Sequence, residues 1–147
     1  MKNTRHATTN YRMLLPFIQT ADENGGYSQF RSEGYMPLSI EYLHYLDYFG
    51  DEVYAMSHTG IMNGDLMRDP EITFSVNHEK KTIRPLTFRN DYAFGYYVEC
   101  FESARLYYPK RLTDTDNFLN MWLKNLDDQG FNPIAGIKLE NVTSWEA

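Results

Sequence analysis

Three residues with the chemistry of a metal or proton-transfer site, His58, Asp65 and Asp69, lie within one short stretch, HTGIMNGDLMRDP. Imidazole and carboxylate groups bind metals and accept protons, so these residues could serve a metal-dependent hydrolase. Their spacing matches no known site, and the chain has no HExxH, P-loop, GxSxG or GxGxxG motif. We therefore predict no catalytic residue, no metal and no cofactor, and keep the metal-dependent hydrolase as an alternative.

The same stretch also has a purely structural explanation. Asn63 and Gly64 tolerate positive φ angles and favour a turn. Asp69 precedes Pro70, which pushes its backbone toward the extended conformation that starts a strand. We therefore expect a loop that leads into a strand at Glu71.

A second polar cluster comes about twenty residues later and contains Arg84, Arg89, Asn90 and Asp91 next to Tyr92. If a strand over residues 72–76 pairs with one over residues 83–88, the two clusters fall at the same end of the sheet. The result is either a salt-bridge network that pins two loops or a polar recognition patch rimmed by tyrosines. The predicted binding residues are Asp65, Arg68, Asp69, Arg89, Asp91, Tyr92, Tyr96 and Tyr97.

The chain is acidic and rich in aromatic residues, with a formal net charge of −6, 12 Tyr and 9 Phe in 147 residues. The charge argues against nucleic-acid binding by bulk electrostatics, which needs clustered Lys and Arg. A nucleic-acid accessory protein using Lys80, Lys81, Arg84 and Arg89 remains a further alternative. The excess of tyrosine favours a protein contact surface, although strand propensity alone also enriches tyrosine.

Composition also indicates the setting of the protein. Hydrophobic residues make up 42% and charged residues 23%, which is typical of a folded globular domain. No apolar run approaches the roughly 18 residues of a spanning helix, and no apolar segment follows the basic start of the chain. Cys100 is the only cysteine, so intramolecular disulfides and cysteine-built zinc sites are excluded. We expect a cytoplasmic protein with no membrane association.

Hydrophobic periodicity predicts the secondary structure. Residues 11–18 show helical spacing after a possible N-cap at Asn10, and Pro16 should kink or shorten that helix. Alternating apolar residues predict strands within residues 36–45, 52–58, 71–78, 81–88 and 91–101, with a shorter strand-like piece at residues 134–139. A second helix is expected from about Asp114 to Gln129, opened by a capping box of Thr113 and Asp116. Gly130 should terminate it.

This order of elements predicts an α+β fold. We expect an antiparallel β-meander of about five to six strands, with an N-terminal and a C-terminal helix packed on one face. Residues 1–147 should form a single domain, with residues 1–8 frayed and residues 132–147 as a tail. The C-terminal helix should bury Trp122 against Ile72, Phe74 and Val76.

Three segments of the chain resemble a known family: NGDLMRDPE at residues 63–71, RNDY at residues 89–92, and FLxxWLKNLxxQGF at residues 118–131. The chain resembles the small uncharacterised domain proteins carried by bacterial conjugative elements, plasmids and phages. The resemblance implies a shared fold, and it brings no established reaction, cofactor or ligand. A mobile-element setting favours a role in interaction with the host, such as inhibition of a defence system. We therefore predict a non-enzymatic interaction protein with a protein partner.

Overall fold

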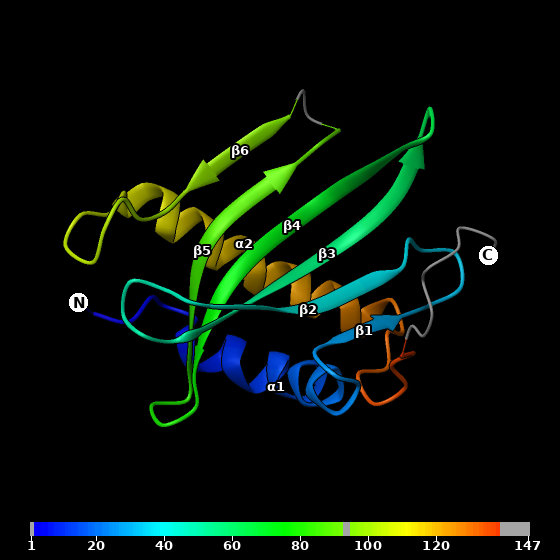
Figure 1. The fold of residues 1–147 in the computed structure, drawn as a ribbon, viewed down its shortest axis with the longest axis horizontal. Helices are drawn as coiled ribbons and strands as arrows, with labels where there is room; N and C mark the ends of the chain where they lie inside the picture. Colours follow the sequence, from blue (N-terminus) through cyan, green and yellow to red (C-terminus); the bar gives the residue numbers. More distant parts are fainter. Residues whose placement is uncertain (1, 93–94, 139–147) are drawn as a thin grey trace.

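The computed structural model describes residues 2–92 and 95–138, which contain two helices and six strands. In chain order these are α1 (Ala7–Glu23), β1 (Tyr27–Phe30), β2 (Leu38–Leu46), β3 (Glu52–Met62), β4 (Asp65–Asn77), β5 (Thr82–Asn90), β6 (Tyr96–Glu99) and α2 (Pro109–Asp128). The strands form one sheet in sequence order, and each neighbouring pair is antiparallel. Figure 1 shows the strands side by side, with α2 passing behind them. The predicted α+β meander with two terminal helices is confirmed.

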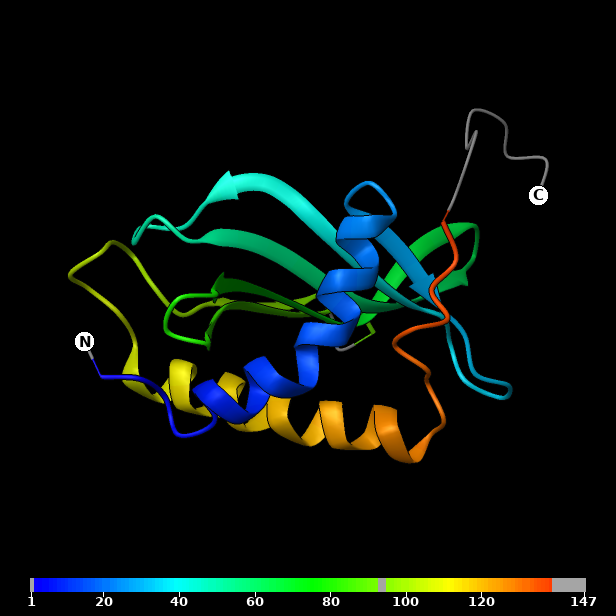
Figure 2. The same ribbon diagram turned by 90° about the horizontal axis from the view of Figure 1, so that it is seen from below.

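Both helices pack on the same face of the sheet (Figure 2). The main core lies between them and the sheet, and it contains Trp122 together with the inward-facing Ile72, Phe74 and Val76, as expected. Among the described residues, no helix or strand covers the opposite face, which we call the open face. No helix within residues 2–92 and 95–138 is long and apolar enough to cross a bilayer.

The helix α2 begins earlier than its sequence pattern predicted. Pro109 occupies its first turn, where the missing N–H costs no hydrogen bond, so the helix starts five residues before Asp114. The predicted capping box is therefore wrong: Thr113 and Asp116 lie inside the helix. Its end agrees with the prediction, because Gly130 has a φ of 83° and the Phe131 N–H donates to the Leu126 carbonyl at 3.1 Å.

The helix α1 begins at Ala7 and runs through Pro16 to Glu23. In Figure 2 its axis changes direction partway along, as expected of a helix with an internal proline. Asn10 is buried inside the helix and is not its N-cap. The start of the chain was expected to be frayed, but Thr4 and the His6 backbone donate hydrogen bonds to Asp116 of α2.

The stretch predicted as a loop is mostly a β-hairpin. Strands β3 and β4 continue to Met62 and Asp65, so only Asn63 and Gly64 form the turn. Both turn residues have positive φ angles, 53° and 83°, the combination of a type I′ turn whose twist matches the strands. The turn predicted at Asn63 and Gly64 is confirmed, whereas residues 65–70, which were expected to form a loop, belong to strand β4.

Two differences concern the edge of the sheet beside β1. Strand β1 was not predicted, because its four residues are too short to show a period. The strand-like piece at residues 134–139 contributes one isolated bridge, between Ile137 and Gln29 of β1, and Leu139 lies outside the described residues. Elsewhere in the sheet, a hairpin turn joins β4 and β5 at residues 78–81.

Candidate binding groove

The open face of the sheet is organised in three layers across β4 and β5. The strand register places Ser75 opposite Arg84, Thr73 opposite Thr87, and Glu71 opposite Arg89. Successive residues on one face of a strand are about 7 Å apart. A neutral threonine layer therefore lies between two layers that each contain an arginine.

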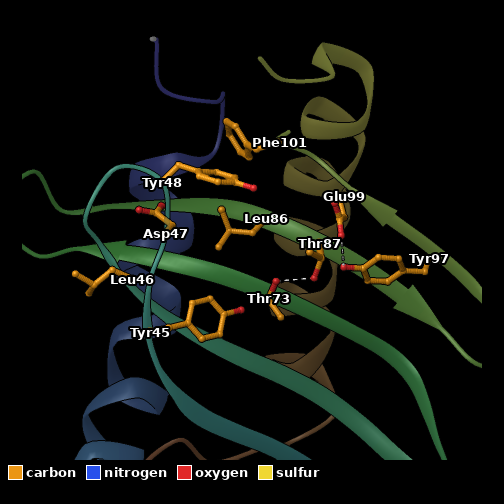
Figure 3. Close-up of a pocket in the computed structure, with 10 residues that line it drawn as sticks. All are labelled: Tyr45, Leu46, Asp47, Tyr48, Thr73, Leu86, Thr87, Tyr97, Glu99 and Phe101. Atoms are coloured by element: carbon orange, nitrogen blue, oxygen red, sulfur yellow. Dashed lines mark hydrogen bonds between the residues drawn. The ribbon is translucent and has the colours of Figure 1, made fainter. Parts of the chain in front are cut away.

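A groove runs over the threonine layer. It consists of two adjoining hollows of about 370 Å³ and 500 Å³, which share Tyr45, Thr73, Thr87 and Tyr97. Figure 3 shows the first hollow, with side chains from β2, β6 and the β2–β3 turn around Thr73 and Thr87. We call both hollows together the open-face groove. Its lining is Leu43, Tyr45, Leu46, Asp47, Tyr48, Glu71, Thr73, Leu86, Thr87, Arg89, Asp91, Gly95, Tyr97, Glu99 and Phe101.

The polar side chains on the floor of the groove are hydrogen-bonded to each other. The hydroxyls of Thr73 and Thr87 form a hydrogen bond to each other at 2.5 Å. Cross-strand threonine pairs of this kind stabilise a sheet. The floor is therefore a rigid, neutral surface and carries no nucleophile activated by a base.

Tyr45 lies on the outward face of β2, within a bulge. The pairing of β2 with β3 shifts between Tyr42 and Leu46, and His44 takes a φ of 62°. Tyr42 still packs against the core, whereas Leu43 and Tyr45 both line the groove. Alternation along β2 turns Leu43 and Tyr45 to the face opposite Tyr42, so the predicted alternation is confirmed through Tyr45. The bulge changes the pairing of this segment with β3.

Tyr97 of β6 forms the opposite wall. Its hydroxyl donates to Glu99 Oε1 at 3.1 Å. Burial, this hydrogen bond and nearby negative charge raise the pKa of Tyr97 to about 12. Burial and the charge of Glu71 also raise the pKa of Tyr45. Both phenols therefore stay protonated at neutral pH and act as hydrogen-bonding aromatic surfaces.

One ion-pair network closes the groove at the β2–β3 turn. Arg84 Nη1 lies 2.8 Å from Asp47 Oδ2 and 3.1 Å from Asp51 Oδ2, and its guanidinium stacks 4.1 Å from the centroid of the Phe49 ring. Asp47 also accepts hydrogen bonds from the backbone N–H groups of Phe49 and Asp51. The turn that carries Tyr48 is thereby anchored to the sheet.

A second network lies at the other end, where the sequence predicted two polar clusters to meet. Arg68 bonds Glu71 at 3.1 Å, and its backbone N–H donates to Asp91 Oδ2 at 2.8 Å. Arg89 bonds the other oxygen of Asp91 at 2.7 Å. Asp69 accepts a hydrogen bond from Asn90 at 2.8 Å. Because Arg89 and Asp91 also line the groove, this network defines the groove's second end.

Tyr92 joins this network only through its backbone N–H, which donates to Asn90 Oδ1 at 3.0 Å, and the other predicted binding residues do not join it. Asp65 lies exposed at the tip of the β3–β4 hairpin, opposite Met62. Tyr96 faces the helices, where its ring contacts Phe88. The Tyr92 hydroxyl lies 3.0 Å from the place a β-carbon on Gly60 would occupy, so this ring packs against β3. Of the three predicted rim tyrosines, only Tyr97 lines the groove.

His58, Asp65 and Asp69 do not converge. His58 is buried on the helix side, where its Nδ1–H donates to the Met36 carbonyl at 3.0 Å and its ring contacts Trp122. Burial lowers the pKa of His58. Asp65 lies at the hairpin tip, on the order of 10 Å further along the strands. Within the described ranges, no three His, Cys, Asp or Glu side chains are placed to hold a metal ion.

The basic residues of the nucleic-acid alternative are also dispersed. Lys80 and Lys81 lie at the β4–β5 turn beside α1, and they line a hollow that includes Tyr11. Arg84 and Arg89 lie on the open face and are engaged with carboxylates. The four side chains therefore do not form one cationic surface.

Cys100 is buried in a small apolar cluster, and burial raises its pKa.

Most of the groove was missed by the sequence analysis. Thr73 was expected to point outward, but the sequence provided no reason to pair it with Thr87. Tyr45 and Tyr48 were counted in the excess of aromatic residues, but the sequence analysis did not predict that they line a groove. Alternation in β5 and β6, read together with the register, was the signal that could have found Thr87 and Glu99.

Comparison with known protein families shows which family the chain belongs to. Residues 9–132 match a domain of unknown function, DUF6908. The chain belongs to the DUF6908 family. This agrees with the expected membership of an uncharacterised domain family, and the DUF6908 match includes all six strands, the whole of α2 and α1 from residue 9 onward. No curated protein and no solved structure matches the chain.

Proposed function

We propose that this DUF6908 protein is a non-enzymatic binding module and that the open-face groove is where it binds a partner protein. One observation carries the proposal: three tyrosines of the groove, Tyr45, Tyr48 and Tyr97, keep 51%, 59% and 50% of their surface exposed. Tyrosine offers a large, rigid area with a polar tip, which is why it is enriched at protein interfaces. These exposed rings surround a hollow on a face that the helices leave uncovered.

The polar groups of the groove support binding over catalysis. Thr73 bonds Thr87, Arg84 bonds Asp47, and Arg89 bonds Asp91. A catalytic base needs a pKa near the working pH and a position beside a reacting group. The phenols of Tyr45 and Tyr97 have raised pKa values, which moves them away from that range.

The setting of the interaction is a finer proposal. Cys100 is the single cysteine of the sequence, so the fold uses no intramolecular disulfide, which suits a reducing compartment such as the cytoplasm. The resemblance to domains of conjugative elements, plasmids and phages supports a partner in a host cell, such as a component of a defence system. The identity of the captured partner tests both points.

The experiment is an affinity capture from host lysate with three baits: the wild-type chain, Tyr45→Ser and Tyr35→Ser. Tyr35 is as exposed as Tyr45, at 50%, but it lies in the β1–β2 connection outside the groove. Interface tyrosines often contribute 1–2 kcal/mol or more, so Tyr45→Ser should lower recovery of the partner on the order of tenfold. Tyr35→Ser should recover it like the wild type. Equal recovery by both variants, or no protein enriched by the wild type, would contradict the proposal.

A further inference from the structure

We propose that the open-face groove recognises a lysine or arginine side chain on an exposed segment of the partner protein. This inference rests on the proposed function and names the chemistry of the partner. It follows from how the charges of the groove are paired and from where its aromatic rings lie.

The carboxylates that line the groove differ in their pairing. Asp47 is neutralised by Arg84, Glu71 by Arg68, and Asp91 by Arg89. Glu99 is the exception: within the described part of the chain, no Lys or Arg nitrogen lies within 4.0 Å of its carboxylate. It accepts one hydrogen bond, from the Tyr97 hydroxyl, and a carboxylate can accept about four. Among the described residues, Glu99 is therefore a groove carboxylate without an ion pair, and the Arg111 guanidinium nearby donates to its backbone carbonyl at 3.2 Å.

Aromatic rings surround the same hollow. Tyr45 and Tyr48 lie on one side, Tyr97 on the other, and Phe101 beyond them, with the Thr73–Thr87 pair between (Figure 3). A cation near the face of an aromatic ring is attracted by the ring quadrupole. The methylene groups of a lysine or arginine side chain would lie along Leu86, which also lines this hollow. A cationic side chain thus matches the aromatic rings, Leu86 and Glu99 together.

The same charges disfavour an anionic ligand. The arginine that lines the groove, Arg89, is bonded to Asp91, and Arg84 at the opposite end is bonded to two aspartates. An anion would have to break these pairs and approach Glu99. The two hollows are also continuous through Tyr45 and Tyr97, so the groove has room for a chain that continues past the bound side chain. This favours a peptide segment as the occupant.

The test is an NMR titration of the full ¹⁵N-labelled chain with three probes of similar length. N-acetyl-arginine amide and N-acetyl-lysine amide carry a charge, and N-acetyl-norleucine amide is neutral. We expect at least one charged probe to shift the amides of Tyr45, Thr87 and Glu99 in a saturable manner, and the neutral probe to leave them unchanged. Equal binding of norleucine, shifts located elsewhere, or no binding of either charged probe would overturn the inference.

A substitution at Glu99 provides the second arm. Glu99 is exposed, so Glu99→Gln should fold normally, and loss of an exposed ion pair should weaken probe binding about two- to fivefold. Glu33→Gln changes the net charge equally at an exposed site in the β1–β2 connection and should bind like the wild type. Equal affinity of Glu99→Gln and the wild type would refute the role of Glu99.

The affinity capture separates this inference from the proposed function. If capture of a partner depends on Tyr45 but the charged probes do not bind, the proposal of a binding module is supported and the proposal of a bound cationic side chain is refuted. Probe binding at the groove without any captured partner overturns the proposed protein interaction instead. A captured partner whose binding survives Glu99→Gln counts against the cationic side chain.

Discussion

Asp116 of α2 accepts a hydrogen bond from the backbone N–H of His6, the N-cap residue of α1, at 3.0 Å. Its other oxygen accepts from the Thr4 hydroxyl at 2.6 Å and from the Asn10 amide at 3.4 Å. In a capping box a residue of the same helix reaches back to the N-cap N–H. Here a carboxylate of another helix does so, and its charge faces the positive end of the α1 dipole. The contact joins the two ends of the described chain.

We predict that Asp116→Ala destabilises the protein by about 2–3 kcal/mol, because it leaves one buried and two half-buried donors without this acceptor. Urea unfolding followed by circular dichroism measures the change. Asp114→Ala, on the same helix but with a side chain that is 61% exposed, should change stability by less than about 0.5 kcal/mol. Similar stabilities for the two variants would mean that Asp116 does not hold the helices together.

Arg84 should be required for the stability of the β2–β3 turn. The Asp47 side chain is 1% exposed, so Arg84→Ala leaves a buried carboxylate without its cation. We expect a loss of about 2 kcal/mol in unfolding free energy, with backbone hydrogen bonds to Asp47 limiting the cost. The control is Arg105→Ala at an exposed position, which should be close to neutral. Amide hydrogen exchange at residues 47–51 should accelerate in Arg84→Ala only.

His58 should make stability depend on pH in the weakly acidic range. Burial holds its pKa below the unfolded-state value of about 6.5, so the unfolded chain binds the proton more readily. The contribution of neutral His58 is complete above about pH 6.5 and declines as the pH falls toward the folded-state pKa. One group can contribute a slope of at most about 1.4 kcal/mol per pH unit.

Urea unfolding between pH 7.5 and pH 5 measures this dependence. The variant His58→Asn keeps a donor for the Met36 carbonyl but cannot titrate, so its profile should be flatter than that of the wild type. His44→Asn is the control, since asparagine tolerates the positive φ at this exposed bulge. A His58→Asn profile parallel to the wild type would exclude His58 as the origin of the slope.

Trp122 should be among the largest single contributors to the core. It is 5% exposed and contacts both His58 and Phe118. Trp122→Ala should cost about 3–5 kcal/mol through lost burial and the resulting cavity. Met121→Ala, at a neighbouring residue that is 49% exposed, should cost far less. Thermal unfolding of both variants tests the difference, and equal melting temperatures would contradict it.

The sequence by itself determined the elements whose cause is local. Alternation at Ile72, Phe74 and Val76 predicted a strand with one buried face, and the Gly130-Phe131 pair predicted the end of α2. Such patterns depend on residues within one or two turns of each other, so they are visible without the fold. The same information predicted that Arg68 and Asp69 would lie near Arg89 and Asp91, because antiparallel pairing alone brings them together.

Some residues suit several structural roles when only their neighbours in the sequence are considered. For these residues, only the tertiary structure decided which role they have. Asp116 suits a capping box in its own helix, yet the earlier start at Pro109 buries it against α1. His58 looks like a ligand beside two aspartates, yet the register turns it toward Trp122. Tyr45 lies on the outward face of its own strand, yet only the pairing of the six strands places it across the groove from Tyr97. Register, bulges and interhelical contacts are set by residues distant in the chain, so the sequence pattern did not reveal the groove.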